Sequence, residues 1–149
     1  MDQKKLRRLD RFAQFAAVAA QAACQQAQLI PDRIDPYRVG VIIGSGIGGI
    51  STMEAQHDLL KDRGPGRVSP FFIPMFIPDI AAGLISIRFG AKGPNYATVS
   101  ACASGAHAIG DAFRFIERGD ADVMIAGGGE ATITPLAVAG FASMRALST

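Results

Sequence analysis

The chain of 149 residues contains no tryptophan, only two cysteines, Cys24 and Cys102, and only two histidines, His57 and His107. The cysteines form no CxxC pair, and the histidines do not complete a zinc-binding spacing. A disulfide framework and a structural metal site are therefore not expected. Free thiols fit a reducing compartment, and we predict a cytoplasmic protein.

An excess of one charge is also lacking, since the net charge is +2 at pH 7. This near balance of positive and negative side chains does not indicate nucleic acid or a membrane surface as a partner. No apolar run reaches the ~20 residues that a membrane-spanning helix needs. The charged, then alanine-rich N-terminus does not resemble a secretory signal. We expect one modest, soluble core.

Helical and strand patterns alternate along the chain, which predicts an α/β layered fold with a mainly parallel sheet. The apolar run 71–78 contains Pro74 and Pro78, which exclude it from the interior of a sheet. Residues 63–70 are a predicted loop. The predicted helices are 4–28, the segment after 49 to about 61, 79–89 and 104–118, and the predicted strands are 39–43, 96–101 and 122–127.

The two ends of the chain lack the signals of a complete domain. The first predicted element is a helix with no strand before it, and the last segment, ASMRALST, carries no pattern of a finished fold. We therefore expect residues 1–149 to be part of a larger α/β enzyme.

Gly44, Gly46 and Gly49 form a GxGxxG pattern between a predicted strand and a predicted helix. A dinucleotide site also needs a second strand that ends in an acidic residue about 20 residues further on. That region here reads RVSPFFIPMF and has neither feature. We therefore favour a tight turn where the backbone passes close to another segment, and NAD binding is a distant alternative. No cofactor is predicted.

Cys102 stands between a predicted strand that ends at Ala101 and a predicted helix that opens with ASGAHAIG. The unpaired N–H groups of a helix N-terminus stabilise a thiolate and can form part of an oxyanion hole. Small neighbours let a substrate carbonyl reach the sulfur. The sequence therefore predicts Cys102 as a nucleophile, whereas Cys24, on an alanine-rich helix face, fits a buried structural cysteine.

Two further groups of residues have a more ordinary explanation. His107 follows Cys102 on the same predicted helix, and its side chain should diverge from the helix terminus, so a role as catalytic base is disfavoured. His57 is expected on a helix surface. A basic cluster near the N-terminus is usually a solvated helix face, with a docking patch for an acidic partner as the alternative; it comprises Lys4, Lys5, Arg7, Arg8 and Arg11.

Four segments together resemble the elongating type of β-ketoacyl-acyl carrier protein synthase, of the synthase II group in the thiolase-like superfamily. They are GSGIGG (44–49), SPFFIP (69–74), GPNYATVSACASGAHAIGDAFRFIERGDADVMIAGGGEA (93–131) and TPLAVAGFASMRALST (134–149). The CxSG part is shared with thiolases, whereas SPFFIP and RALST favour the elongating synthases. The resemblance implies part of the N-terminal half of a thiolase-like fold, without its first strand and C-terminal half, and a homodimer.

The resemblance also implies a reaction, a decarboxylating Claisen condensation in fatty acid elongation. Acyl carrier protein delivers an acyl group to Cys102, and malonyl carrier protein then loses CO2 and attacks the acyl-enzyme. Ile47, Ala101 and Phe141 match acyl-pocket positions, and Phe72 matches a pocket residue contributed across the dimer. Lys4, Arg7, Arg8 and Arg145 match positions that meet the carrier protein. The family's two catalytic histidines and its lysine belong to the C-terminal half.

Two other functions stay open at this point. A ketosynthase domain of polyketide synthesis shares the fold, and sequence beyond Thr149 would separate the two. A non-catalytic partner subunit of such an enzyme is the other alternative. Cys102 argues against it, because subunits of that kind typically lack the nucleophile.

Overall fold

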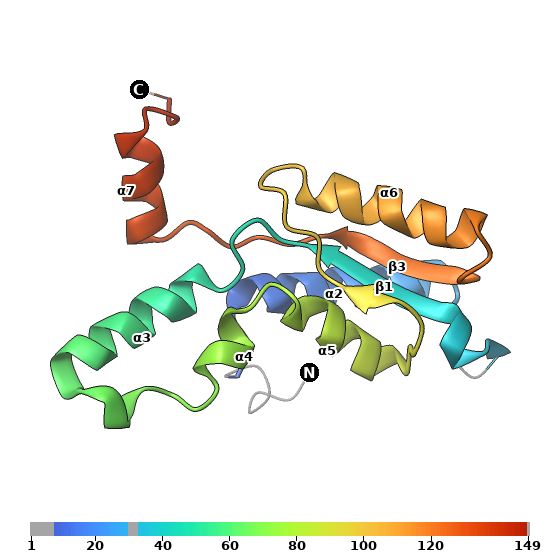
Figure 1. Ribbon diagram of the computed structural model, residues 1–149, viewed down its shortest axis with the longest axis horizontal. Helices are drawn as coiled ribbons and strands as arrows, with labels where there is room; N and C mark the ends of the chain where they lie inside the picture. Colours follow the sequence, from blue (N-terminus) through green and yellow to red (C-terminus); the bar gives the residue numbers. More distant parts are fainter. Residues whose placement is uncertain (1–7, 30–32, 149) are drawn as a thin grey trace.

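The computed structural model describes residues 8–29 and 33–148. A parallel sheet of three strands, in the order β2-β1-β3, forms the centre of this part of the chain (Figure 1). The strands are β1 (Val39–Gly44), β2 (Asn95–Tyr96) and β3 (Val123–Gly128). Helix α6 (Ser104–Glu117) covers one face, and α2 (Arg11–Gln26) and α5 (Ile80–Phe89) cover the other. The predicted α/β layers and the parallel sheet are confirmed.

Strand β1 is buried along its whole length, as a central parallel strand should be. Its side chains alternate between two cores. Val41 and Ile43 pack with α2 and α5, whereas Ile42 packs with Ala108 and Ala112 of α6. The small residues of α6 keep that helix close to the sheet.

Helix α2 begins later than its apolar periodicity predicts. The predicted start at residue 4 lies outside the described residues, but Asp10 already has extended backbone angles and caps the helix that starts at Arg11. Its Oδ1 accepts the N–H of Phe12 at 3.3 Å. The carboxylate therefore fixes where the helix begins.

The predicted strand 96–101 is wrong over most of its length, because β2 ends at Tyr96. Beyond it the Thr98 carbonyl still bonds to the residue after β1, but the following backbone turns its hydrogen bonds toward the start of α6. The Ser45 N–H donates to the Thr98 carbonyl at 3.2 Å, and the Ser100 N–H donates to Ser104 Oγ at 2.8 Å. The β-branched residues Thr98 and Val99 gave this segment its strand pattern.

The remaining helices occupy the segments between the sheet elements and after them. Helix α3 (Ile50–Arg63) agrees with the prediction, and the 3-10 turns η2 (Pro36–Arg38) and η3 (Pro65–Arg67) lie in loops. The proline-containing run forms a short helix, α4 (Phe72–Phe76), so its exclusion from the sheet is confirmed. Helix α7 (Pro135–Ser143) was not predicted, and it projects from the layers in Figure 1. Among the described residues, no helix has the length and apolarity to cross a bilayer.

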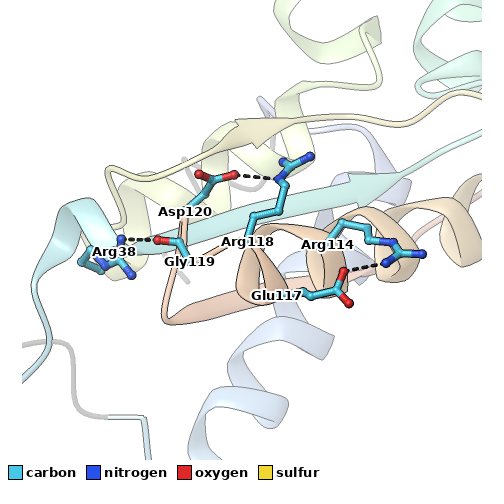
Figure 2. Close-up of polar contacts among 6 residues, drawn as sticks. All are labelled: Arg38, Arg114, Glu117, Arg118, Gly119 and Asp120. Carbon is cyan, nitrogen blue, oxygen red and sulfur yellow. Dashed lines mark hydrogen bonds and ion pairs between the residues drawn. The ribbon is translucent and has the colours of Figure 1, made fainter.

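The amino end of the sheet is held by Arg38, the residue directly before β1. Its guanidinium binds both carboxylate oxygens of Asp122, at 2.5 and 3.1 Å, and donates to the Gly119 carbonyl at 2.7 Å. Arg38 therefore lowers the pKa of the Asp122 carboxyl. Figure 2 shows Arg38 beside Gly119, with the surface pairs Arg118–Asp120 and Arg114–Glu117 nearby.

Asp10 also joins the first turns of α2 and α3. Its Oδ2 accepts hydrogen bonds from the hydroxyls of Ser51 and Thr52, at 2.7 and 2.6 Å, and from the Thr52 N–H at 3.0 Å. Asp10 is only 3% exposed. A buried carboxylate with four donors is stable because its lost hydration is replaced.

We predict that Asp10→Ala destabilises any folded protein that contains this segment by about 3 kcal/mol, because it leaves buried donors unsatisfied and removes a helix cap. Urea unfolding measures the change. Asp62→Ala, at an exposed position of α3, is the matched control and should change the free energy of unfolding by less than about 0.5 kcal/mol. Equal effects of the two substitutions would contradict the role given to Asp10.

Candidate functional site

Cys102 lies in a sharp turn between the end of β2 and the start of α6, and it is exposed. The preceding residue, Ala101, has φ of 50°, a left-handed conformation that is unfavourable for a residue with a Cβ. Its carbonyl is held by the N–H of Ser104 at 3.1 Å and by Ser104 Oγ at 2.7 Å. The turn presents the thiol at the carboxyl edge of the sheet.

Ser104 fastens this turn from the first position of α6. Besides its bond to Ala101, its hydroxyl accepts the Ser100 N–H, and its own carbonyl accepts the Thr98 hydroxyl at 2.7 Å. The side chain is 3% exposed. These bonds hold the strained turn in place and replace the strand pairing that was predicted here.

The helix that follows Cys102 approaches the sheet closely because glycines face its first turn. A Cβ on Gly44 would lie 2.3 Å from the Ser104 backbone. A Cβ on Gly128 would lie 3.0 Å from the Cα of Gly105. Any side chain at Gly44 would therefore displace the helix terminus that carries Cys102.

The glycine-rich turn after β1 encloses the carboxylate of Glu130. Oε2 accepts the N–H of Gly46 at 2.7 Å and of Ile47 at 3.1 Å, and Oε1 accepts the Ser45 hydroxyl at 3.1 Å. Successive backbone N–H groups of this kind make an anion-binding concavity. The chain's own carboxylate occupies this concavity, so the N–H groups of the GxGxxG turn bind an internal anion.

The same turn passes close to other backbone segments, as predicted for these glycines. A Cβ on Gly48, whose φ is 75°, would lie 2.7 Å from the Phe76 carbonyl, and one on Gly49 would lie 2.5 Å from that of Met75. The tight-turn interpretation is therefore confirmed. Glu130 itself was not predicted as part of this site. A carboxylate just after a neighbouring parallel strand was the available signal.

The His107 side chain is exposed and also contacts the hydroxyl of Ser100. Its Nδ1 lies 2.5 Å from the Ser100 Oγ. His57 lies on α3 beside Asp58, with its side chain 63% exposed. The described residues contain no group of three or more His, Cys, Asp or Glu side chains that could hold a metal ion.

The predicted acyl-pocket residues fall into separate places. Ile47 and Ala101 belong to one cluster of turns, because a Cβ on Gly46 would lie 3.4 Å from the Cα of Ala101. Phe72 lies on α4, where its ring centroid is 5.8 Å from that of Phe76. Phe141 lies on α7, away from the layers (Figure 1).

Of the predicted docking residues, Lys4 and Arg7 lie outside the described residues. The Arg8 guanidinium lies 4.3 Å from the centroid of the Phe71 ring, a favourable cation–π distance. Arg145 is exposed, has φ of 58° and follows the end of α7. Helix α7 is attached to α3 through Glu54, whose Oε1 accepts the Thr134 hydroxyl at 2.5 Å.

The two thiols have opposite environments. Cys24 is 5% exposed on α2, and burial raises the pKa of its thiol. Cys102 is exposed in its turn. The structure therefore agrees with the predicted contrast between a buried cysteine and an accessible one.

We predict that iodoacetamide alkylates Cys102 at least ~10-fold faster than Cys24, because the reagent can reach the Cys102 thiol, whereas the Cys24 thiol is buried and burial raises its pKa. Mass spectrometry of the two cysteine-containing peptides gives both rates in one sample. Equal rates, or faster labelling of Cys24, would rule out Cys102 as the accessible nucleophile.

Solved structures similar to this chain are ketosynthases. A ketosynthase in complex with its type II polyketide acyl carrier protein aligns over 99% of this chain and 43% of its own, with a TM-score of 0.92 and 26% identity. A beta-ketoacyl synthase from Burkholderia phymatum aligns with a TM-score of 0.85 and 33% identity, over 99% of this chain and 36% of its own.

Among curated proteins, the 3-oxoacyl-[acyl-carrier-protein] synthase 2 of Staphylococcus aureus is 58% identical over all of this chain, which covers 37% of that protein. The synthase 2 of a Synechocystis strain is 53% identical over 99% of this chain and 36% of its own length. The chain thus spans little more than a third of these relatives. The family pattern described as "Beta-ketoacyl synthase, N-terminal domain" matches residues 1–149, and the chain therefore belongs to the beta-ketoacyl synthase family.

Proposed function

We propose that the protein of which this chain forms part is a 3-oxoacyl-[acyl-carrier-protein] synthase that elongates fatty acids, with Cys102 as its nucleophile. The exposed thiol in the strained turn before α6 is the observation that carries the proposal. Identity of 58% to a curated synthase 2 supports this particular reaction.

The thiolate of Cys102 attacks the thioester carbonyl of an acyl carrier protein. The carbon–sulfur bond to the carrier breaks, the carrier leaves as a thiolate that takes a proton from water, and the acyl group stays on Cys102. Malonyl carrier protein next loses CO2, and the electron pair of the broken carbon–carbon bond remains as an enolate. This carbanion attacks the acyl-enzyme, the Cys102 thiolate leaves, and a 3-oxoacyl carrier protein with two more carbons is released.

The turn at Cys102 suits the acylation half of this sequence. Small residues at Ala101 and Ala103 leave room around the sulfur, and the N-terminus of α6 lies beside it. Its partial positive charge favours a developing oxyanion. We expect the Cys102 N–H to be one oxyanion donor. The groups that promote decarboxylation belong, by the family resemblance, to the C-terminal half.

Polyketide synthesis is the main alternative. The polyketide ketosynthase has a TM-score of 0.92 to this chain, but its sequence identity is only 26%. The synthase 2 relatives share more than half of their matched residues with this chain. The fatty acid reaction is therefore the better supported of the two, and the presence of Cys102 disfavours a non-catalytic partner subunit.

We infer acyl carrier protein as the partner, in keeping with the ketosynthase complex among the similar structures. Lys4, Arg7, Arg8 and Arg145 are the proposed docking residues. Arg8 and Arg145 are exposed, and stacking on Phe71 orders the Arg8 guanidinium. Arginine and lysine would pair with an acidic carrier surface.

We also infer a homodimer, with a cytoplasmic location supported by the two free thiols. Helix α6 has an apolar face directed away from the sheet. It consists of Ile109, Phe113 and Ile116, which are 59%, 60% and 47% exposed. Their spacing puts them on one side of the helix, and the C-terminal half that the family resemblance implies is the proposed cover. In the inferred homodimer Phe72 would contribute to the partner's acyl pocket.

We predict that Cys102→Ala in the full-length protein lowers condensation at least ~10³-fold, because no covalent acyl-enzyme can form. The assay measures CO2 release from malonyl carrier protein together with 3-oxoacyl product. Cys24→Ala is the control and should retain activity within about twofold, because alanine already dominates that buried face. The 149-residue chain alone should show no turnover in the same assay, because the groups that promote decarboxylation belong, by the family resemblance, to the C-terminal half. Substantial activity of Cys102→Ala would refute the proposed nucleophile.

We predict that Lys4→Glu together with Arg8→Glu raises KM for acyl carrier protein about tenfold or more with little change in kcat, because the contacts act in binding and not in chemistry. The wild-type affinity should fall as salt rises. Lys61→Glu with Arg63→Glu, at the exposed end of α3, reverses the same charge elsewhere and should leave KM unchanged. A similar KM for both double variants would assign the cluster to ordinary surface charge.

A further inference from the structure

Glu130 joins two segments that the fold brings together at the carboxyl edge of the sheet. It follows β3 by two residues, and its three hydrogen bonds all go to the turn after β1, to Ser45, Gly46 and Ile47. The bonds to two successive N–H groups fix the orientation of the peptide between Gly46 and Ile47. The direction in which the Ile47 side chain leaves the backbone therefore depends on this carboxylate.

The turn held by Glu130 lies directly against the turn that carries Cys102. A Cβ on Gly46 would lie 3.0 Å from Glu130 Oε2 and 3.3 Å from the Ala101 carbonyl oxygen. The far side of that carbonyl is bound by Ser104. A shift of the Gly46 peptide would consequently be transmitted to the residue that precedes the nucleophile and to Ile47 together.

Glu130 is exposed, so its bonds compete with water and add little to the stability of the fold. The Ser45 hydroxyl contributes a second link, because it donates to Glu130 and accepts the Gly48 N–H at 3.1 Å. An exposed carboxylate with three converging donors is better suited to orient a loop than to stabilise a core.

We propose that Glu130 is a positioning residue that sets acyl-chain specificity by fixing Ile47 relative to Cys102. The inference rests on the proposed function, in which Ile47 lines the acyl pocket. A short acyl chain on Cys102 needs only the turn around the thiol. A long chain must pass Ile47, and its turnover therefore depends on how the Glu130 carboxylate holds that residue.

The test compares Glu130→Gln, Glu130→Ala and Ser45→Ala in the full-length protein, with Glu117→Gln as the control. Glu117 is an exposed glutamate at the end of α6, paired with Arg114. We expect the ratio of kcat/KM for palmitoyl over butyryl carrier protein to fall at least ~5-fold in Glu130→Ala and less in Glu130→Gln, which keeps one acceptor. The control ratio should not change.

A purely structural role would lower kcat/KM equally for both acyl chains, and this result, or an unchanged ratio, would overturn the proposal. Hydrogen exchange supplies a readout that needs no activity. The amides of Gly46 and Ile47 should exchange at least ~10-fold faster in Glu130→Gln, with α6 unchanged. If the wild-type protein elongates neither substrate, the proposed function fails. Unchanged exchange at these two amides would then still overturn the positioning role of Glu130.

Discussion

The approach of α6 to the carboxyl ends of β1 and β3 is the constraint on which the site depends. Gly44 and Gly128 leave no Cβ between the sheet and the first turn of the helix, so backbone meets backbone there. Such contact brings the helix terminus to the edge of the sheet and forces the connection from β2 into a short, strained turn. Cys102 is exposed because it occupies that turn.

Three carboxylates fix the elements around this contact, each by accepting hydrogen bonds from more than one group. Asp10 joins the start of α2 to the start of α3, Glu54 joins α3 to the N-terminus of α7, and Glu130 joins the end of β3 to the turn after β1. All three bind backbone N–H groups as well as hydroxyls. Backbone donors hold a loop in one orientation, which is what a site assembled from turns requires.

The glycine-rich turn illustrates how one local pattern can have different uses. Its successive N–H groups could bind a phosphate, as they do in dinucleotide-binding proteins. Here Glu130 supplies the anion from within the chain, and the turn lies against Ala101. The anion in this turn thus comes from a residue that lies more than eighty positions away in the sequence.

The sequence by itself determined the layers, the central strand and the identity of the accessible thiol. Periodicity and the strand-to-helix change at Cys102 are local signals, and most predicted helices agree with the structure. It could not determine the end of β2, because the β-branched Thr98 and Val99 have the same pattern whether or not a partner strand is present. Nor could it place Glu130 in the glycine turn, since that contact exists only when parallel strands bring their ends together. Tertiary structure decided both, because backbone donors take whichever acceptor the fold brings within reach.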